Sequence, residues 1–159
     1  MSASRVLLMA LALGLSASLA AQDFDAARYK TSSLGDIIEK SKKTQHLEPL
    51  EADIVAGEAS YRVDLEWTGN RRPIDPATLG FLTMWLRTLG LPDDHAALFQ
   101  EELCFKEGSA EYWLPVQATL VKDITAELKA GSRLRLYVVW MGSVGNERFF
   151  FIVNGYDDL

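Results

Sequence analysis

Apolar and polar residues alternate in two stretches of the chain, and each stretch predicts a β-strand with one face toward solvent. The stretches are Tyr61–Trp67, where the polar positions are charged, and Arg133–Met141. A third segment, Phe149–Val153, is apolar at every position and predicts a strand that is covered on both faces. Because a loop-like segment containing two glycines (142–146) separates the last two stretches, they predict a hairpin.

Between these strands, apolar residues at spacings of three and four predict helices. Ser33 and Asp36 resemble a capping pair for a helix that fades near Thr44. Asp75 and Pro76 predict the start of a second helix, because an N-cap carboxylate and a first-turn proline both suit a helix N-terminus. The other predicted elements are a turn at Thr68–Asn70, a short helix capped by Asp93 or Asp94, strands at 103–106 and 111–114, and a helix at 116–130.

The predicted order is helix, strand, helix pair, two strands, helix and hairpin, which favours an α+β fold over a doubly wound parallel sheet. We expect a small, mainly antiparallel sheet or an OB-like barrel, backed by helices and with an N-terminal helix. The resemblance to the oligonucleotide/oligosaccharide-type barrel is one of element order. Because the sequence contains no repeat or linker, residues 21–159 are predicted to form a single α+β domain.

Residues 1–20 have the pattern of a cleaved signal peptide. Arg5 precedes an apolar run at 6–15 and small residues follow it, so we expect a signal peptidase to cut after Ala20 or Ala21. The run is shorter than the about 20 residues that cross a bilayer, which argues against a membrane anchor. Because no cysteine lies near the cut, lipidation is not expected, and the sequence predicts a periplasmic or secreted protein.

The chain of 159 residues has a formal net charge of −6, which becomes −7 once Arg5 leaves with the leader. An acidic domain repels phosphate groups, so neither nucleic acid nor an anionic membrane is an expected partner. Cys104 is the single cysteine, so an intramolecular disulfide cannot form. We expect a buried thiol at this position, with an intermolecular disulfide as the alternative.

Motifs for nucleotide binding and hydrolysis are absent from the sequence, which has no glycine-rich fingerprint and no G-x-S-x-G or H-E-x-x-H motif. The densest group of potential ligands is Asp93-Asp94-His95. Neighbouring helical residues diverge by about 100°, which favours a capping carboxylate and a solvated histidine over a metal site. Asp64 and Glu66 share a strand face, where we expect exposed charges rather than a catalytic pair. No catalytic residue, metal or cofactor is therefore predicted.

The segment most typical of a binding site places Trp67 at a strand end and Arg71 and Arg72 after a turn. Arginine binds carboxylate or phosphate with two hydrogen bonds and stacks on aromatic rings, so this segment is a candidate recognition loop. The alternative is a surface turn whose arginines pair with the protein's own carboxylates. Trp113 and Tyr137 either extend the aromatic surface or belong to the core.

These observations predict an exported, non-catalytic binding or accessory domain whose partner is an envelope protein or an anionic ligand. The hypothesis rests on the leader, the single domain and the absence of a catalytic motif from the sequence. Two alternatives stay open at this point. One is a small secreted hydrolase that uses scattered carboxylates with His95, and the other is an inhibitor or immunity protein of a secreted toxin.

Overall fold

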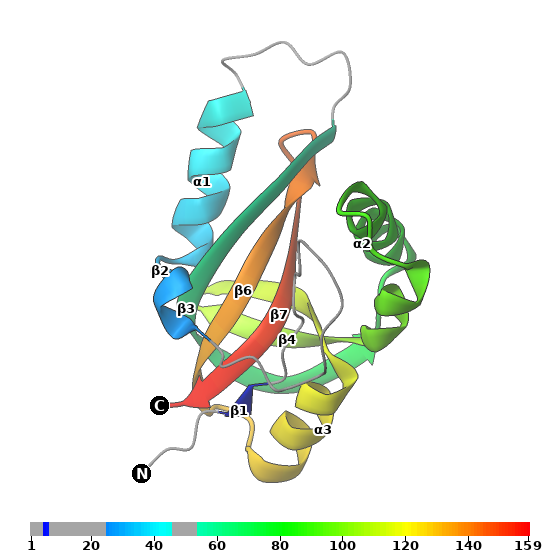
Figure 1. The fold of residues 1–159 in the computed structure, drawn as a ribbon. Coiled ribbons are helices and arrows are strands. Elements are labelled where there is room, and N and C mark those ends of the chain that lie inside the picture. Colours follow the sequence, from blue (N-terminus) through cyan, green and yellow to red (C-terminus); the bar gives the residue numbers. More distant parts are fainter. Residues whose placement is uncertain (1–4, 7–24, 46–53) are drawn as a thin grey trace.

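Five strands form a closed, mixed β-barrel at the centre of the protein (Figure 1). They are β3 (Ile54–Pro73), β4 (Glu101–Glu107), β5 (Ala110–Val116), β6 (Arg133–Val144) and β7 (Arg148–Asp158). Around the barrel their order is β3-β4-β5-β7-β6, and β6 pairs again with β3. Neighbouring strands are antiparallel except β5 and β7, which run parallel. The predicted α+β fold with an OB-like barrel is confirmed.

The computed structural model describes residues 5–6, 25–45 and 54–159. The predicted signal peptide therefore lies outside the described residues, except for β1 (Arg5–Val6), which pairs with Gly155 and Tyr156 of β7. The next elements are the short 3-10 helix η1 (Ala26–Arg28), the strand β2 (Lys30–Thr31), which runs parallel to β3, and the helix α1 (Leu34–Gln45).

β3 bends near its middle and so belongs to both halves of the barrel. Most of its length up to Glu66 pairs with β6, whereas Arg71–Pro73 pair with β4 after a register shift. This bulge corrects the predicted turn at Thr68–Asn70, because the chain continues as a strand through that segment. Gly69 has a φ of +86°, a left-handed conformation that suits a turn and a bulge equally, so the residue types do not distinguish the two.

A second bulge shortens the predicted loop of the β6–β7 hairpin. β6 continues to Val144, and its register with β7 shifts between Trp140 and Gly142. Gly142, with a φ of +140°, accommodates the extra residue. The segment 142–144 therefore stays in the strand, and the turn is confined to residues 145–147.

The helix α2 (Pro76–Thr88) begins at its predicted N-cap. The carboxylate of Asp75 accepts hydrogen bonds from the backbone N–H groups of Ala77 and Thr78, both at 3.1 Å. Gly90 follows the helix with a φ of +71°, the left-handed conformation expected at a helix end. The predicted boundaries of this helix are thus confirmed by its contacts.

The next helix differs from its prediction at the cap. η2 (Asp93–Leu98) is a 3-10 helix that begins after Pro92 and has no side-chain cap. Asp93 instead accepts two hydrogen bonds from Arg87, because a guanidinium at the end of α2 competes for the carboxylate. The last helix, α3 (Ala118–Glu127), lies between β5 and β6 in the sequence and is shorter than the predicted 116–130.

The N-terminus of α1 is fastened to the barrel by a carboxylate. Ser33 Oγ accepts a hydrogen bond from the N–H of Asp36 at 3.0 Å, which confirms the predicted capping pair. Glu107, at the end of β4, accepts from the N–H groups of Leu34 and Gly35 at 2.9 and 3.0 Å. The first four backbone N–H groups of a helix have no acceptor within the helix. The Glu107 carboxylate accepts from two of these groups in α1 and so joins the helix to the β4–β5 hairpin.

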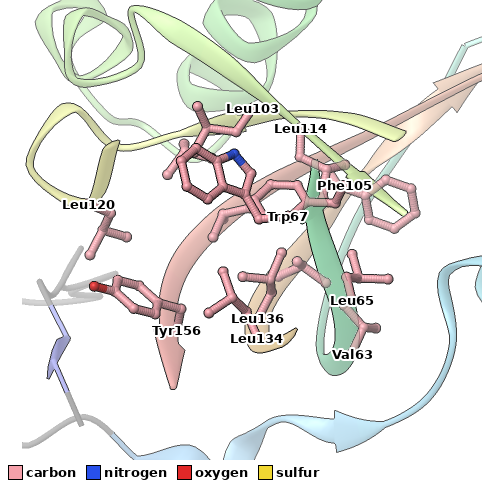
Figure 2. Close-up of a cluster of buried hydrophobic side chains, with 14 of the residues drawn as sticks. Val63, Leu65, Trp67, Leu103, Phe105, Leu114, Leu120, Leu134, Leu136 and Tyr156 are labelled. Carbon is pink, nitrogen blue, oxygen red and sulfur yellow. The ribbon is translucent and has the colours of Figure 1, made fainter. Parts of the chain in front are cut away.

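Two apolar clusters stabilise this arrangement. The first fills the barrel interior, where inward strand residues meet Leu34 and Ile37 of α1 and Leu120 of α3 (Figure 2). The second joins α2 to the outer faces of β6 and β7 and so holds the helix beside the β6–β7 hairpin. Its buried members are Phe81, Leu82, Trp85, Leu86, Ala96, Phe99, Val139, Met141, Phe150 and Ile152.

We expect Gly69→Ala and Gly80→Ala to change stability in opposite directions. At Gly69 the backbone disfavours a Cβ, which would also lie 2.8 Å from the Cβ of Ala130, so we expect a loss of about 1–2 kcal/mol. Gly80 lies in α2 with nothing within 4 Å of an added Cβ, so alanine should stabilise by up to about 1 kcal/mol. Urea unfolding followed by circular dichroism measures both changes, and a neutral Gly69→Ala would contradict the bulge.

Candidate functional site

A crevice of about 220 Å³ opens between β5 and β7, next to the start of α2. In the described part of the chain, one backbone pair joins these two strands, between Val116 and Val153. Residues that precede this pair on both strands line the crevice, together with part of the β6–β7 turn and α2. The lining residues are Thr78, Trp113, Leu114, Pro115, Glu147, Arg148, Phe149, Phe150 and Phe151.

The edges of β5 and β7, rather than their faces, border this crevice. Successive side chains of a strand point to opposite faces. Three consecutive residues of β5 (Trp113–Pro115) and five around the start of β7 (Glu147–Phe151) can therefore line one space together when the strand edge faces it. At their other edges β5 pairs with β4 and β7 pairs with β6. The crevice thus lies beside main-chain groups as well as side chains.

Three of the four aromatic residues of the lining lie beneath a cation. The guanidinium of Arg72 lies 4.3 Å from the ring centre of Trp113, and that of Arg148 lies 5.7 Å from that of Phe150. The ammonium of Lys42, in α1, lies 5.9 Å from the ring centre of the third aromatic residue, Phe149. Such contacts are attractive because the face of an aromatic ring is electronegative, and they place three positive charges around the crevice.

Arg72 is held in place by a buried carboxylate. Its Nε donates to Oε2 of Glu102 at 2.6 Å, and Arg72 and Glu102 are direct partners across β3 and β4. The Glu102 side chain is 1% exposed, whereas that of Arg72 is 45% exposed. A buried carboxylate needs a charged or hydrogen-bonding partner, so Glu102 fixes the position of Arg72 on the rim of the crevice.

Arg148 links the β6–β7 hairpin to α2. Its Nη2 donates to Oδ2 of Asp75 at 3.1 Å, the same carboxylate that caps α2. The pKa of Asp75 is lowered, first by the backbone N–H of Thr78 and further by Arg148, because both interactions stabilise the ionised form. The crevice wall that α2 contributes is therefore tied to the wall that β7 contributes.

The structure brings two of the five sequence-predicted site residues together. Arg72 and Trp113 stack beside the crevice, although they lie 41 positions apart in the sequence and on two different strands, β3 and β5. Arg71 points elsewhere and pairs with Glu101 at 3.4 Å, with its side chain 56% exposed. Trp67 lies in the barrel interior and is 5% exposed (Figure 2).

Tyr137 lies on β6, which is not a neighbour of β5 in the barrel, and it fastens the N-terminal segment instead. Its hydroxyl donates to Oδ2 of Asp157 at 2.6 Å, and its ring meets that of Tyr29 edge to face at 5.2 Å. Burial and the hydrogen bond to Asp157 raise the pKa of Tyr137 to about 12.

The sequence did not predict most of the lining, including Thr78, Arg148 and the aromatic run of β7. The run Phe149–Phe151 carried a signal, because it is apolar on both faces, and that signal predicted a covered strand. Coverage by α2 on one face and the barrel core on the other is what the structure shows. The edge of β7 that borders the crevice could not be predicted, because the pattern of apolar and polar side chains reports on the two faces of a strand and not on its edges.

The other candidate groups lie away from the crevice. Nδ1 of His95 is 3.1 Å from Oδ1 of the adjacent Asp94, an exposed contact at η2. The predicted burial of Cys104 is confirmed, since it is 1% exposed. Within residues 25–45 and 54–159, histidine, cysteine and carboxylate side chains do not gather in groups of three that would hold a metal ion.

No protein-family model, curated protein or solved structure matches the chain. The helices of the described segments are each too short or too polar to cross a membrane.

Alkaline pH is expected to unfold the protein in part through Tyr137. Below pH 10 its phenol is protonated in the folded and unfolded states, so its stabilising contribution is complete. Between pH 10 and about 12 the unfolded state loses this proton first, so stability falls across that range. Unfolding free energies at a series of pH values, compared with Tyr137→Phe, measure the effect. Equal pH dependence of the two proteins would contradict the assignment.

Proposed function

We propose that the protein is an exported, non-catalytic binding module whose ligand occupies the crevice between β5 and β7. The observation that carries the proposal is that Arg148, in the lining of the crevice, and Arg72, over the ring of Trp113, are each held by a carboxylate and an aromatic ring. Groups that are already ordered lose little conformational entropy when a ligand binds, which favours affinity. The partner we propose is an envelope protein, bound through a segment that enters the crevice.

The chemistry of the lining supports binding rather than catalysis. Its titratable residues are Glu147 and Arg148, both exposed, and the other lining residues are apolar apart from Thr78. Glycoside hydrolysis needs two carboxyl groups on either side of the reacting bond, and the lining provides one, Glu147. His95, the residue on which a hydrolase hypothesis depends, does not line the crevice. The geometry therefore favours a binding module.

Export remains part of the proposal and rests on the sequence of residues 1–20. The net charge of −6 disfavours nucleic acid, so the OB-like barrel is not proposed to bind oligonucleotides here. The positive charges at the crevice are local and are balanced by Glu102 and Asp75. We accordingly propose a protein partner in the periplasm or outside the cell.

Site-specific photo-crosslinking tests the crevice as the binding site. We expect p-benzoylphenylalanine at Thr78, in cells that naturally produce the protein, to yield an adduct with a partner, because this side chain lines the crevice. The same group at Lys122, exposed on α3, is the positional control and should yield none.

Two substitutions sharpen this test. Trp113→Ala removes a wall of the crevice and should reduce the Thr78 adduct at least fivefold, whereas Arg71→Ala, which changes an exposed pair with Glu101, should leave it unchanged. Thermal unfolding of each variant verifies that it is folded. Equal adducts at Thr78 and Lys122, or none at Thr78, would overturn the proposed site.

A further inference from the structure

We propose that the crevice binds an extended peptide segment of the partner, which pairs as a β-strand with the open edges of β5 and β7. This inference rests on the proposed function and specifies the class of ligand. It follows from three properties of the crevice: the strand edges that border it, its covered aromatic rings and its length.

Along the crevice, the facing edges of β5 and β7 are not paired with each other, so another strand could pair with them. Among the described residues, β5 and β7 are joined by one pair, Val116–Val153, and the crevice begins directly before it on both strands. An extended peptide placed there continues the sheet, because strand addition needs an edge and a spacing of about 4.8 Å between backbones. Pro115 has no N–H, so β7 supplies most of the main-chain donors.

The aromatic rings are poorly placed to bind a nucleobase or a sugar. Such ligands stack on the face of an exposed ring. Arg72 lies over the ring of Trp113, and Phe81 stacks on Phe150 with ring centres 4.1 Å apart and planes inclined by 10°. Phe150 is 5% exposed. A stacking ligand would have to displace these neighbours, whereas a strand would contact the ring edges and the main chain.

The length of the crevice determines how much of a chain could lie along it. The run Glu147–Phe151 is about 16 Å long at roughly 3.3 Å per residue, so it matches four or five extended residues. We infer that a short segment of a larger partner lies in the crevice while the remainder lies outside it.

The environment on the two sides of such a strand differs. Side chains that point inward would meet Leu114, Phe149 and Phe151, which are apolar, and those that point outward would meet Arg72 and Arg148. Alternate positions of the peptide are therefore expected to be apolar, with polar or acidic residues between them.

Selection from a phage-displayed library of linear 12-residue peptides on the full chain, followed by calorimetry with the selected synthetic peptide, tests the inference. Methylation of single backbone nitrogens removes a donor without changing the side chain. We expect at least a tenfold loss of affinity at alternate positions of a four- to five-residue core. A peptide that tolerates methylation at every position would overturn strand pairing.

A matched pair of variants locates the binding. Glu147→Trp fills the mouth of the crevice and should weaken peptide binding at least tenfold, whereas Asn146→Trp, on the adjacent exposed position of the β6–β7 turn, should change it less than twofold. Bound peptide should also slow hydrogen exchange at the amides of residues 149–152. Equal affinities of the two variants, or unchanged exchange, would overturn the placement.

Glycan and oligonucleotide arrays separate this inference from the function on which it depends. If a glycan or an oligonucleotide binds, Glu147→Trp abolishes that binding and the library yields no peptide, the crevice is a binding site but the peptide inference is wrong. If the Thr78 crosslinker gives no adduct, the proposed function itself is wrong. A selected peptide with alternating sensitivity to methylation supports both.

Discussion

Closure of the barrel between β5 and β7 is the constraint on which the candidate site depends. Each of these strands is committed along its other edge to an antiparallel hairpin, β5 to β4 and β7 to β6. Hairpins form readily because their strands are adjacent in the sequence, whereas the two hairpins must meet in a parallel arrangement to close the barrel. In the described residues, β5 and β7 pair only at Val116 and Val153. The junction of these two strands, called the seam below, therefore opens beside that pair.

The charges around the junction of β5 and β7 have a structural role, and the proposed function gives them a binding role as well. Glu102 is almost fully buried, and removing Arg72 would leave its carboxylate without the one partner that the hydrogen bonds show. The two interpretations of the arginine segment, self-pairing and recognition, are therefore compatible at Arg72. Arg71 has the same side chain one position earlier, but its pair with Glu101 is exposed, and the register places it on the opposite face of the sheet from Trp113. Burial of the carboxylate, rather than the arginine itself, distinguishes the two positions.

The sequence predicted most elements because alternation and capping are local properties. Strands at Tyr61–Trp67 and Arg133–Met141 and the Asp75 cap each depend on residues within one segment. The bulges at Gly69 and Gly142 were missed, since a glycine between strands suits a turn as well as a bulge. The stacking of Arg72 on Trp113 was suspected but not predictable, because it depends on the register of three strands beyond the first bulge. The crevice itself is a property of backbone edges, on which side-chain patterns carry no information.

An open strand edge is a hazard for any protein, because it can pair with other chains without selection. Three features limit that hazard here. Pro115 removes a donor from β5, Glu147 and Arg148 place charges at the entrance, and the accessible run is short. Long, flat strands from unrelated chains are thus disfavoured, while a short segment with a suitable alternation of apolar and polar residues can enter. The same features that protect the seam from aggregation would therefore determine which peptide it accepts.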